Sequence, residues 1–99
     1  MEQSEMYGDC YLRFFVPSGD DLQLILGRIA RIIDQNGQLH KIDGESRYMI
    51  GDSNDWWLSS FKNDSLNEIV VTRRLPNKEL MFSLRKVIIF FLDIEHFNR

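Results

Sequence analysis

The chain has 99 residues, a hydrophobic fraction of 43% and a net charge of −3, which describe one folded domain and exclude intrinsic disorder. Residues 1–68 carry twelve acidic and six basic side chains, a balance unlike that of a duplex nucleic-acid binder, whereas residues 69–99 carry three acidic and six basic. The single cysteine allows no internal disulfide, and the longest apolar run, Val87–Leu92, is too short to cross a bilayer, so we expect a cytoplasmic protein without a membrane segment.

The first nine residues are polar and acidic, unlike a secretory signal. We expect residues 1–9 to be a flexible tail and residues 10–99 to form a single domain. The aromatic-rich segment 10–16 predicts the first strand. Its apolar face should point to the core, and its mixed face should point away. The apolar face is Cys10, Leu12, Phe14 and Val16, and the mixed face is Tyr11, Arg13 and Phe15.

A helix follows this strand. Ser18, with Asp21 three residues later, has the pattern of a helix N-cap, and an apolar stripe at three- and four-residue steps predicts a helix to about Gln35. Gly37 is expected to end it in the left-handed conformation. Gly27 lies inside the helix, where glycine costs about 1 kcal/mol relative to alanine, and we expect it to permit close packing on the sheet.

Four short segments separated by turn residues come next: 38–42, 45–50, 55–62 and 67–75. Their spacing predicts an antiparallel meander, because parallel strands need long crossovers. The dipeptide Asp43-Gly44 is a strong signal for a hairpin turn between the first two strands.

The third of these strands contains both tryptophans. Consecutive strand side chains point to opposite faces of a sheet, so Trp56 and Trp57 cannot both enter one core. One tryptophan should be buried against the helices and the other should lie on the far face. The sequence does not decide which, since Trp57 shares a face with Ser59 and Phe61 and Trp56 shares one with Leu58.

A second helix ends the chain, with Asn77 as its cap and His96 near its end. Its apolar residues exceed one stripe, so Val87–Leu92 is either buried in the domain or part of an interface. The element order β-α-β-β-β-β-α predicts an α+β fold, a two-layer sandwich with two helices packed on one face of a mainly antiparallel sheet. The other face of the sheet would be open or covered by a partner.

No catalytic, metal-binding or cofactor-binding pattern emerges, so we expect neither an enzyme nor a cofactor. His40, His96 and Cys10 are far apart in sequence and match no zinc spacing. The acidic segment 52–55 is too short for a calcium loop and connects two strands. A Cys10–His40 pair that assembles only in the folded chain stays open as the basis of a small enzyme.

The favoured function is contact with another protein, because interface centres are rich in aromatic, methionine and arginine side chains. The expected partner-binding residues combine aromatic side chains of the sheet with acidic side chains of the loops. They are Trp56, Trp57, Tyr11, Phe15, Asp43, Glu45, Asp52, Asp55 and Asp64. A compact acidic chain of this kind suits an inhibitor of the immunity-protein or antitoxin type, which occludes a basic toxin or nuclease domain.

Two other functions stay open beside the inhibitor and the small enzyme. The chain could be a structural or adaptor subunit that forms a homodimer through the sheet face or through Val87–Leu92. Alternatively, Tyr11, Phe15, Tyr48 and one tryptophan could stack the bases of single-stranded RNA. The acidic balance of residues 1–68, which hold all these aromatic side chains, argues against nucleic acid as a partner.

Overall fold

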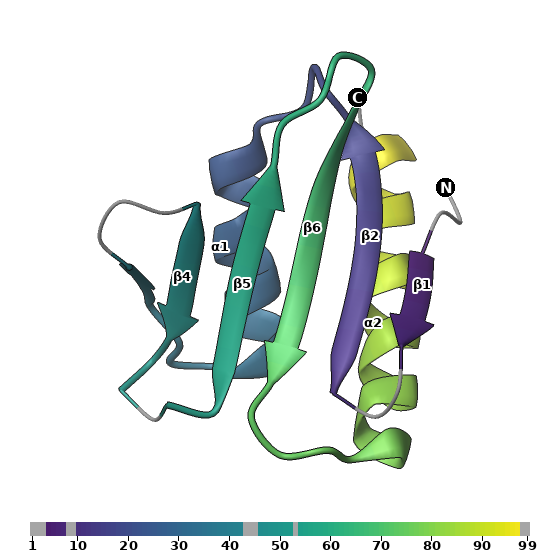
Figure 1. Cartoon of the computed structure of the whole chain (residues 1–99). Helices are drawn as coiled ribbons and strands as arrows, with labels where there is room; N and C mark the ends of the chain where they lie inside the picture. The colour runs from purple at the N-terminus through teal and green to yellow at the C-terminus, as the bar shows by residue number, and fades with distance from the viewer. Residues whose placement is uncertain (1–3, 8–9, 43–45, 53, 98–99) are drawn as a thin grey trace.

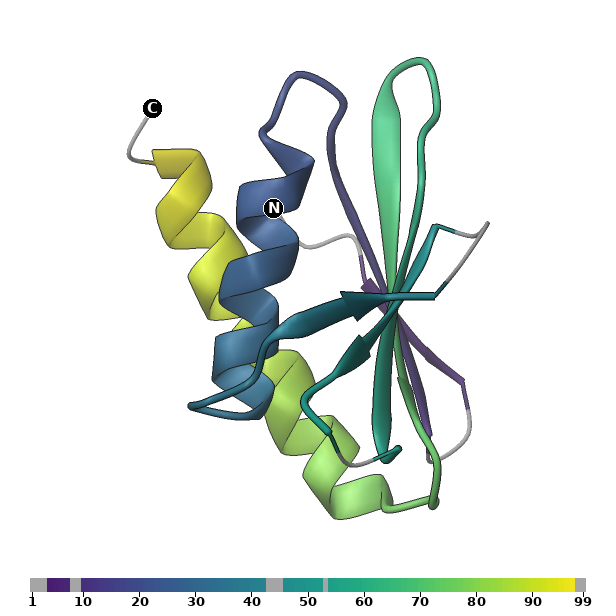
Figure 2. The same ribbon diagram turned by 90° about the vertical axis from the view of Figure 1, so that its left-hand side faces the viewer.

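In a computed structural model, two helices lie on one side of a six-stranded antiparallel sheet (Figures 1 and 2). The structure describes residues 4–7, 10–42, 46–52 and 54–97. The elements in chain order are β1 Ser4–Tyr7, β2 Tyr11–Pro17, α1 Leu22–Ile33, β3 Leu39–Lys41, β4 Arg47–Ile50, β5 Trp56–Phe61, β6 Leu66–Arg73 and α2 Lys78–Phe97. The predicted α+β sandwich is confirmed, and β1 is an additional strand at its edge.

The strands lie in the order β1-β2-β6-β5-β4-β3. β3 to β6 form the predicted meander, in which each strand pairs with the next. β2 joins the meander beside β6, with Tyr11 opposite Thr72. The predicted Asp43-Gly44 turn lies outside the described residues, and the strands on either side of it pair with Lys41 opposite Tyr48.

The N-terminal segment differs from the flexible tail expected over residues 1–9. Ser4–Tyr7 forms β1, which pairs antiparallel with residues 11–14 of β2 at the edge of the sheet (Figure 1). An edge strand is held by backbone hydrogen bonds to a single neighbour, so its sequence needs no clear apolar alternation. Composition alone therefore gave no signal for this strand.

The core lies between the sheet and the helices. The predicted inward face of β2 is buried at Leu12, Phe14 and Val16, whereas Cys10 lies in the turn before the strand and is only half-buried. The helices fill the other side of the core. They contribute Leu22, Ile25, Leu26 and Ile29 from α1 and Met81, Leu84, Ile88 and Leu92 from α2.

The first helix begins later than predicted, and Ser18 is not its cap. Asp21 is the N-cap, and its side chain accepts a hydrogen bond of 3.2 Å from the backbone N–H of Leu24. The hydroxyl of Ser18 instead donates to the backbone oxygen of Asp64, 3.1 Å away, and so joins the β2–α1 loop to the β5–β6 hairpin. Asp21 replaces Ser18 because the chain turns once more before the helix starts.

Two glycines have other roles than those predicted. Among the described glycines only Gly51 has a positive φ, of 68°, so Gly37 does not end the helix in the left-handed conformation. Gly37 is needed for space, since a Cβ there would lie 2.9 Å from the backbone oxygen of Asp34 and from Cγ2 of Ile50. A Cβ at Gly27 would meet no atom within 4 Å, so close packing on the sheet does not explain that glycine.

The second helix starts as predicted, because the side-chain oxygen of Asn77 accepts a 3.0 Å hydrogen bond from the N–H of Leu80. The run Val87–Leu92 is only partly buried in the domain: Ile88 is buried, whereas Val87 is exposed. Over the part of the chain that the structure describes, neither helix combines the length and apolar content needed to span a membrane.

Candidate functional site

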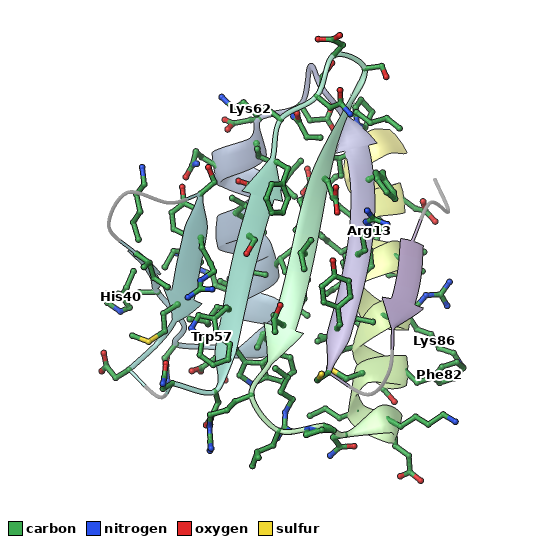
Figure 3. All side chains as sticks on the ribbon, viewed as in Figure 1. Arg13, His40, Trp57, Lys62, Phe82 and Lys86 are labelled. Carbon is green, nitrogen blue, oxygen red and sulfur yellow. The ribbon has the colours of Figure 1, made fainter. Side chains whose placement is uncertain are left out.

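No element of the described residues covers the side of the sheet away from the helices, and we call this side the open face. It is defined by the outward side chains of the strands. These are Tyr11, Arg13, Phe15, His40, Arg47, Met49, Trp57, Ser59, Phe61, Glu68, Val70 and Thr72. Figure 3 views the molecule onto this face, with Trp57 on β5 and Arg13 on β2. Because the residues sit on paired strands, their positions are held by the backbone hydrogen bonds of the sheet.

The alternation along β5 separates the two tryptophans, as predicted. Trp57 lies opposite Met49 of β4 and Thr72 of β6 and belongs to the open face. Trp56 points to the helix-covered side, where it packs against the buried core, and the guanidinium carbon of Arg73 lies 5.5 Å from its ring. Trp56 therefore leaves the set of expected partner-binding residues, and Trp57 stays in it.

Aromatic side chains surround a shallow depression on the open face. Its volume is about 350 Å³, and its lining comes from β2, β4, β5 and β6: Tyr11, Arg47, Trp57, Ser59, Phe61, Val70 and Thr72. Val70 is buried although it points away from the helices, so its taller neighbours shield it. Phe61, at the other end of β5, is exposed. The depression thus has Val70 at its base and the aromatic side chains of Tyr11, Trp57 and Phe61 around it.

Phe15 completes the aromatic part of the face on β2 and is held beside an ion pair. The guanidinium carbon of Arg13 lies 5.4 Å from the ring centre of Phe15. Nε of Arg13 donates to Oε1 of Glu68 at 2.6 Å. This arrangement orders a planar cation among the aromatic side chains and leaves the ion pair half-buried.

The acidic loop residues expected to bind a partner are separated in the fold. Asp52 and Asp55 lie in the loop between β4 and β5, whereas Asp64 lies in the hairpin at the opposite end of β5 (Figure 1). Asp43 and Glu45 lie outside the described residues. The predicted meander already implied this division, because successive loops of an antiparallel meander fall at alternate ends of the sheet.

The two acidic residues near Trp57 differ in their surroundings. The side chain of Asp52 is fully exposed, with one oxygen 3.8 Å from Nε2 of His40. Asp55 accepts a 3.1 Å hydrogen bond from Nε of Arg74, so its charge is partly compensated. Of these two acidic side chains, Asp52 is therefore the more available to a partner.

The structure keeps the candidate catalytic residues apart. Cys10 precedes β2 and His40 lies on β3, and three strands separate these two strands, or about 19 Å at the usual spacing. A Cys10–His40 pair is therefore not formed. His96 belongs to the last turn of α2. Within the described residues no three His, Cys, Asp or Glu side chains are grouped so that they could hold a metal ion.

The site also contains residues that sequence reasoning did not include, chiefly Arg47, Met49 and Thr72, which flank or face Trp57. Only the strand register brings them to the tryptophan. Tyr48, which was expected in an RNA-stacking platform, points to the helix side instead, where its hydroxyl accepts a 3.0 Å hydrogen bond from Gln23.

Comparisons with protein-family models, with curated proteins and with solved structures found no match for this chain.

Proposed function

We propose that this protein is a non-enzymatic binding module that occupies another protein through its open face, as an inhibitor of the immunity-protein or antitoxin type does. The observation that carries the proposal is the position of Trp57 on a rigid, uncovered sheet face beside a shallow apolar depression. A tryptophan in such a place contributes strongly to binding when a partner covers it.

The other residues of the open face support a protein as the ligand. Tyr11, Phe15 and Phe61 add aromatic area, and Met49 adds an adaptable apolar side chain beside Trp57. These residue types are concentrated at the centres of protein interfaces. They sit on strands, so little conformational entropy is lost when a partner orders them.

The proposed partner is basic, and Asp52 is the residue that supports this choice. Its exposed carboxylate lies in the loop that leads into β5, at the end of the strand that holds Trp57. Residues 1–68 also carry a net charge of −6. A positive partner surface would be steered to this side by the long-range field and then held by the aromatic contact.

A single-stranded RNA is a weaker candidate for the same face. Tyr48 points to the helix side and so cannot stack a base on the open face. Arg13, a cation of this face, is paired with Glu68. RNA binding needs cations that follow the phosphate backbone, besides the aromatic side chains.

The proposal is tested by affinity capture from the cells that produce the protein, with three intact baits run in parallel. The baits are the wild-type chain, Trp57→Ala and Leu24→Ala. Leu24 is an exposed apolar residue of α1, on the other side of the sheet, and serves as the matched control. We expect a basic protein that is retained by the wild type and by Leu24→Ala and is lost with Trp57→Ala.

Two outcomes would contradict the proposal: capture of the same proteins by all three baits, or retention that ribonuclease abolishes. Once a partner is identified, Asp52→Asn should weaken its binding several-fold at low ionic strength and less in high salt, because exposed charges are screened. A binding constant measured by titration calorimetry at two salt concentrations gives this difference.

A further inference from the structure

α2 carries apolar side chains on two sides, and the core uses only one of them. Ile88 and the other inward residues are buried, whereas Val87 is 50% exposed and Phe90 is 68% exposed. Phe90 is the most exposed large hydrophobic side chain in the described part of the chain. The outward apolar residues of the helix, with one serine between them, form what we call the outer seam: Leu80, Ser83, Val87, Phe90 and Ile94.

The outer seam has the spacing of a coiled coil. Leu80, Val87 and Ile94 follow one another at intervals of seven residues, and Ser83 and Phe90 each lie three residues after a member of that row. Alternating steps of three and four residues place apolar side chains at heptad positions a and d, where they face a second helix. A helix that packs only on its own domain shows a single apolar stripe. The second apolar stripe of α2 therefore indicates that α2 packs against another helix.

We propose that the outer seam packs against the outer seam of a second copy of this chain, with the two α2 helices antiparallel about a twofold axis. Position a of one helix then faces position d of the other. Val87 lies against the partner's Phe90 at the centre, and Ser83 lies against the partner's Ile94. Each central layer combines a small side chain with a large one. A parallel pair would instead set Phe90 against the partner's Phe90.

Charges beside the outer seam favour the antiparallel order. Lys86 and Asp93 are seven residues apart and flank the same side of the seam at heptad position g. In the antiparallel pair Lys86 lies beside the partner's Asp93, and the twofold axis repeats this ion pair, which sets the orientation of the helices. In a parallel pair Lys86 would face the partner's Phe91.

The structure already holds Lys86 close to the helix surface. Its Nζ lies 4.4 Å from the ring centre of Phe82, one turn earlier on α2 (Figure 3). This cation–π contact restrains a flexible side chain beside the seam, so less entropy is lost when the interface forms. Phe82 itself is exposed but lies outside the heptad row.

The dimer does not depend on the proposed function of the open face. The outer seam belongs to the helix layer, which covers one side of the sheet (Figure 2). Trp57 belongs to the open face on the other side. Two copies joined through α2 would keep both open faces accessible. Failure of one proposal therefore leaves the other untouched.

The first test measures the mass of the intact chain by sedimentation equilibrium over a concentration series that reaches the millimolar range. We expect a monomer–dimer equilibrium for the wild type. Phe90→Ser should weaken dimerisation about a hundredfold, because the twofold axis removes the central side chain from both sides of the interface. The matched control Phe82→Ser removes an equally large exposed ring from the same helix and should weaken the dimer no more than about threefold, because Phe82 restrains Lys86 but lies outside the seam. Circular dichroism confirms that both variants keep their helices.

A wild type that stays monomeric over the whole series would overturn the proposal. So would a dimer that Phe90→Ser and Phe82→Ser affect equally, or one that Trp57→Ala abolishes, since the interface would then lie elsewhere.

The second test decides the orientation by a charge exchange. Lys86→Glu alone should weaken the dimer about tenfold, because two attractive pairs become repulsive. Asp93→Lys alone should act in the same direction. The double variant Lys86→Glu with Asp93→Lys restores both pairs in the antiparallel dimer and should return the dissociation constant to near the wild-type value. A double variant as weak as the single ones would overturn the antiparallel arrangement.

Discussion

At the scale of single residues, the two tryptophans are adjacent in sequence and differ in their surroundings. Trp56 packs against the buried core on the helix side, with Arg73 beside its ring. Trp57 lies between Met49 and Thr72 on the uncovered side. Both side chains are half-buried, and one residue step along the strand places them on opposite faces of the sheet, because strand side chains alternate.

This difference predicts different costs of truncation. Trp56→Ala should lower the free energy of unfolding by about 2–3 kcal/mol, since it leaves a cavity at the edge of the core. Trp57→Ala should lower it by about 1 kcal/mol or less, because the side chain is on the open face. Urea denaturation of the two variants provides the measurement. An equal loss of stability in both would show that the open face is part of the monomer core.

Two glycines allow a second prediction at this scale. Gly27→Ala should raise the free energy of unfolding by about 0.5–1 kcal/mol, because the position is helical and the added methyl group meets no atom within 4 Å. Gly37→Ala is the opposite case and should cost more than about 1 kcal/mol, since its methyl group would overlap Asp34 and Ile50. Thermal and urea unfolding would reveal the opposite signs, and a gain at Gly37 would contradict the packing described for it.

At the scale of elements, the N-cap of one helix was predicted correctly from the sequence and the N-cap of the other was not. Asn77 has the position that the sequence indicated, whereas Asp21 caps α1 in place of Ser18. Both caps accept a backbone N–H from the residue three positions later. Each satisfies a donor that the first turn of a helix leaves without a partner.

The caps can be compared by substitution. Asp21→Ala and Asn77→Ala should each lower the free energy of unfolding by about 1 kcal/mol, whereas Asn77→Asp should retain the cap. Ser18→Ala serves as the control and should change stability by no more than about 0.5 kcal/mol, because its hydroxyl bonds at the exposed surface. Denaturation midpoints with a constant m-value provide the comparison. A larger loss of unfolding free energy in Ser18→Ala than in Asp21→Ala would show that Ser18, and not Asp21, is the N-cap.

At the scale of the whole molecule, the sheet separates two surfaces of different chemistry. The open face is aromatic, with an ordered Arg13–Glu68 pair and an exposed Asp52 at one end. The outer seam of α2 is aliphatic and aromatic and is flanked by Lys86 and Asp93. An ion pair between Arg28 and Glu95 ties α1 to α2 within the helix layer. The two proposed interfaces can therefore form at the same time on opposite sides of one chain.

The sequence by itself determined the local structure and the class of fold. Alternating apolar residues in β2, the three- and four-residue steps of α1 and the close spacing of the later strands were enough to predict an antiparallel sheet with two helices on one face. These are short-range signals, because they depend on the 2-residue and 3.6-residue periods of strand and helix. The same periods showed that Trp56 and Trp57 must lie on opposite faces of the strand, whereas the outer seam of α2 was defined only by the exposure of its side chains in the fold.

The tertiary structure alone decided which tryptophan faces the helices and that Ser4–Tyr7 forms a strand. The alternation of side chains defines two faces of a strand but does not show which face is buried. That choice depends on which set of side chains buries more apolar area against the helices. The predicted meander already sends the loops of Asp52 and Asp64 to opposite ends of β5, and the structure adds that Asp55 is paired with Arg74 whereas Asp52 is fully exposed. β1 is held by backbone hydrogen bonds to β2, a long-range pairing that leaves little trace in side-chain pattern.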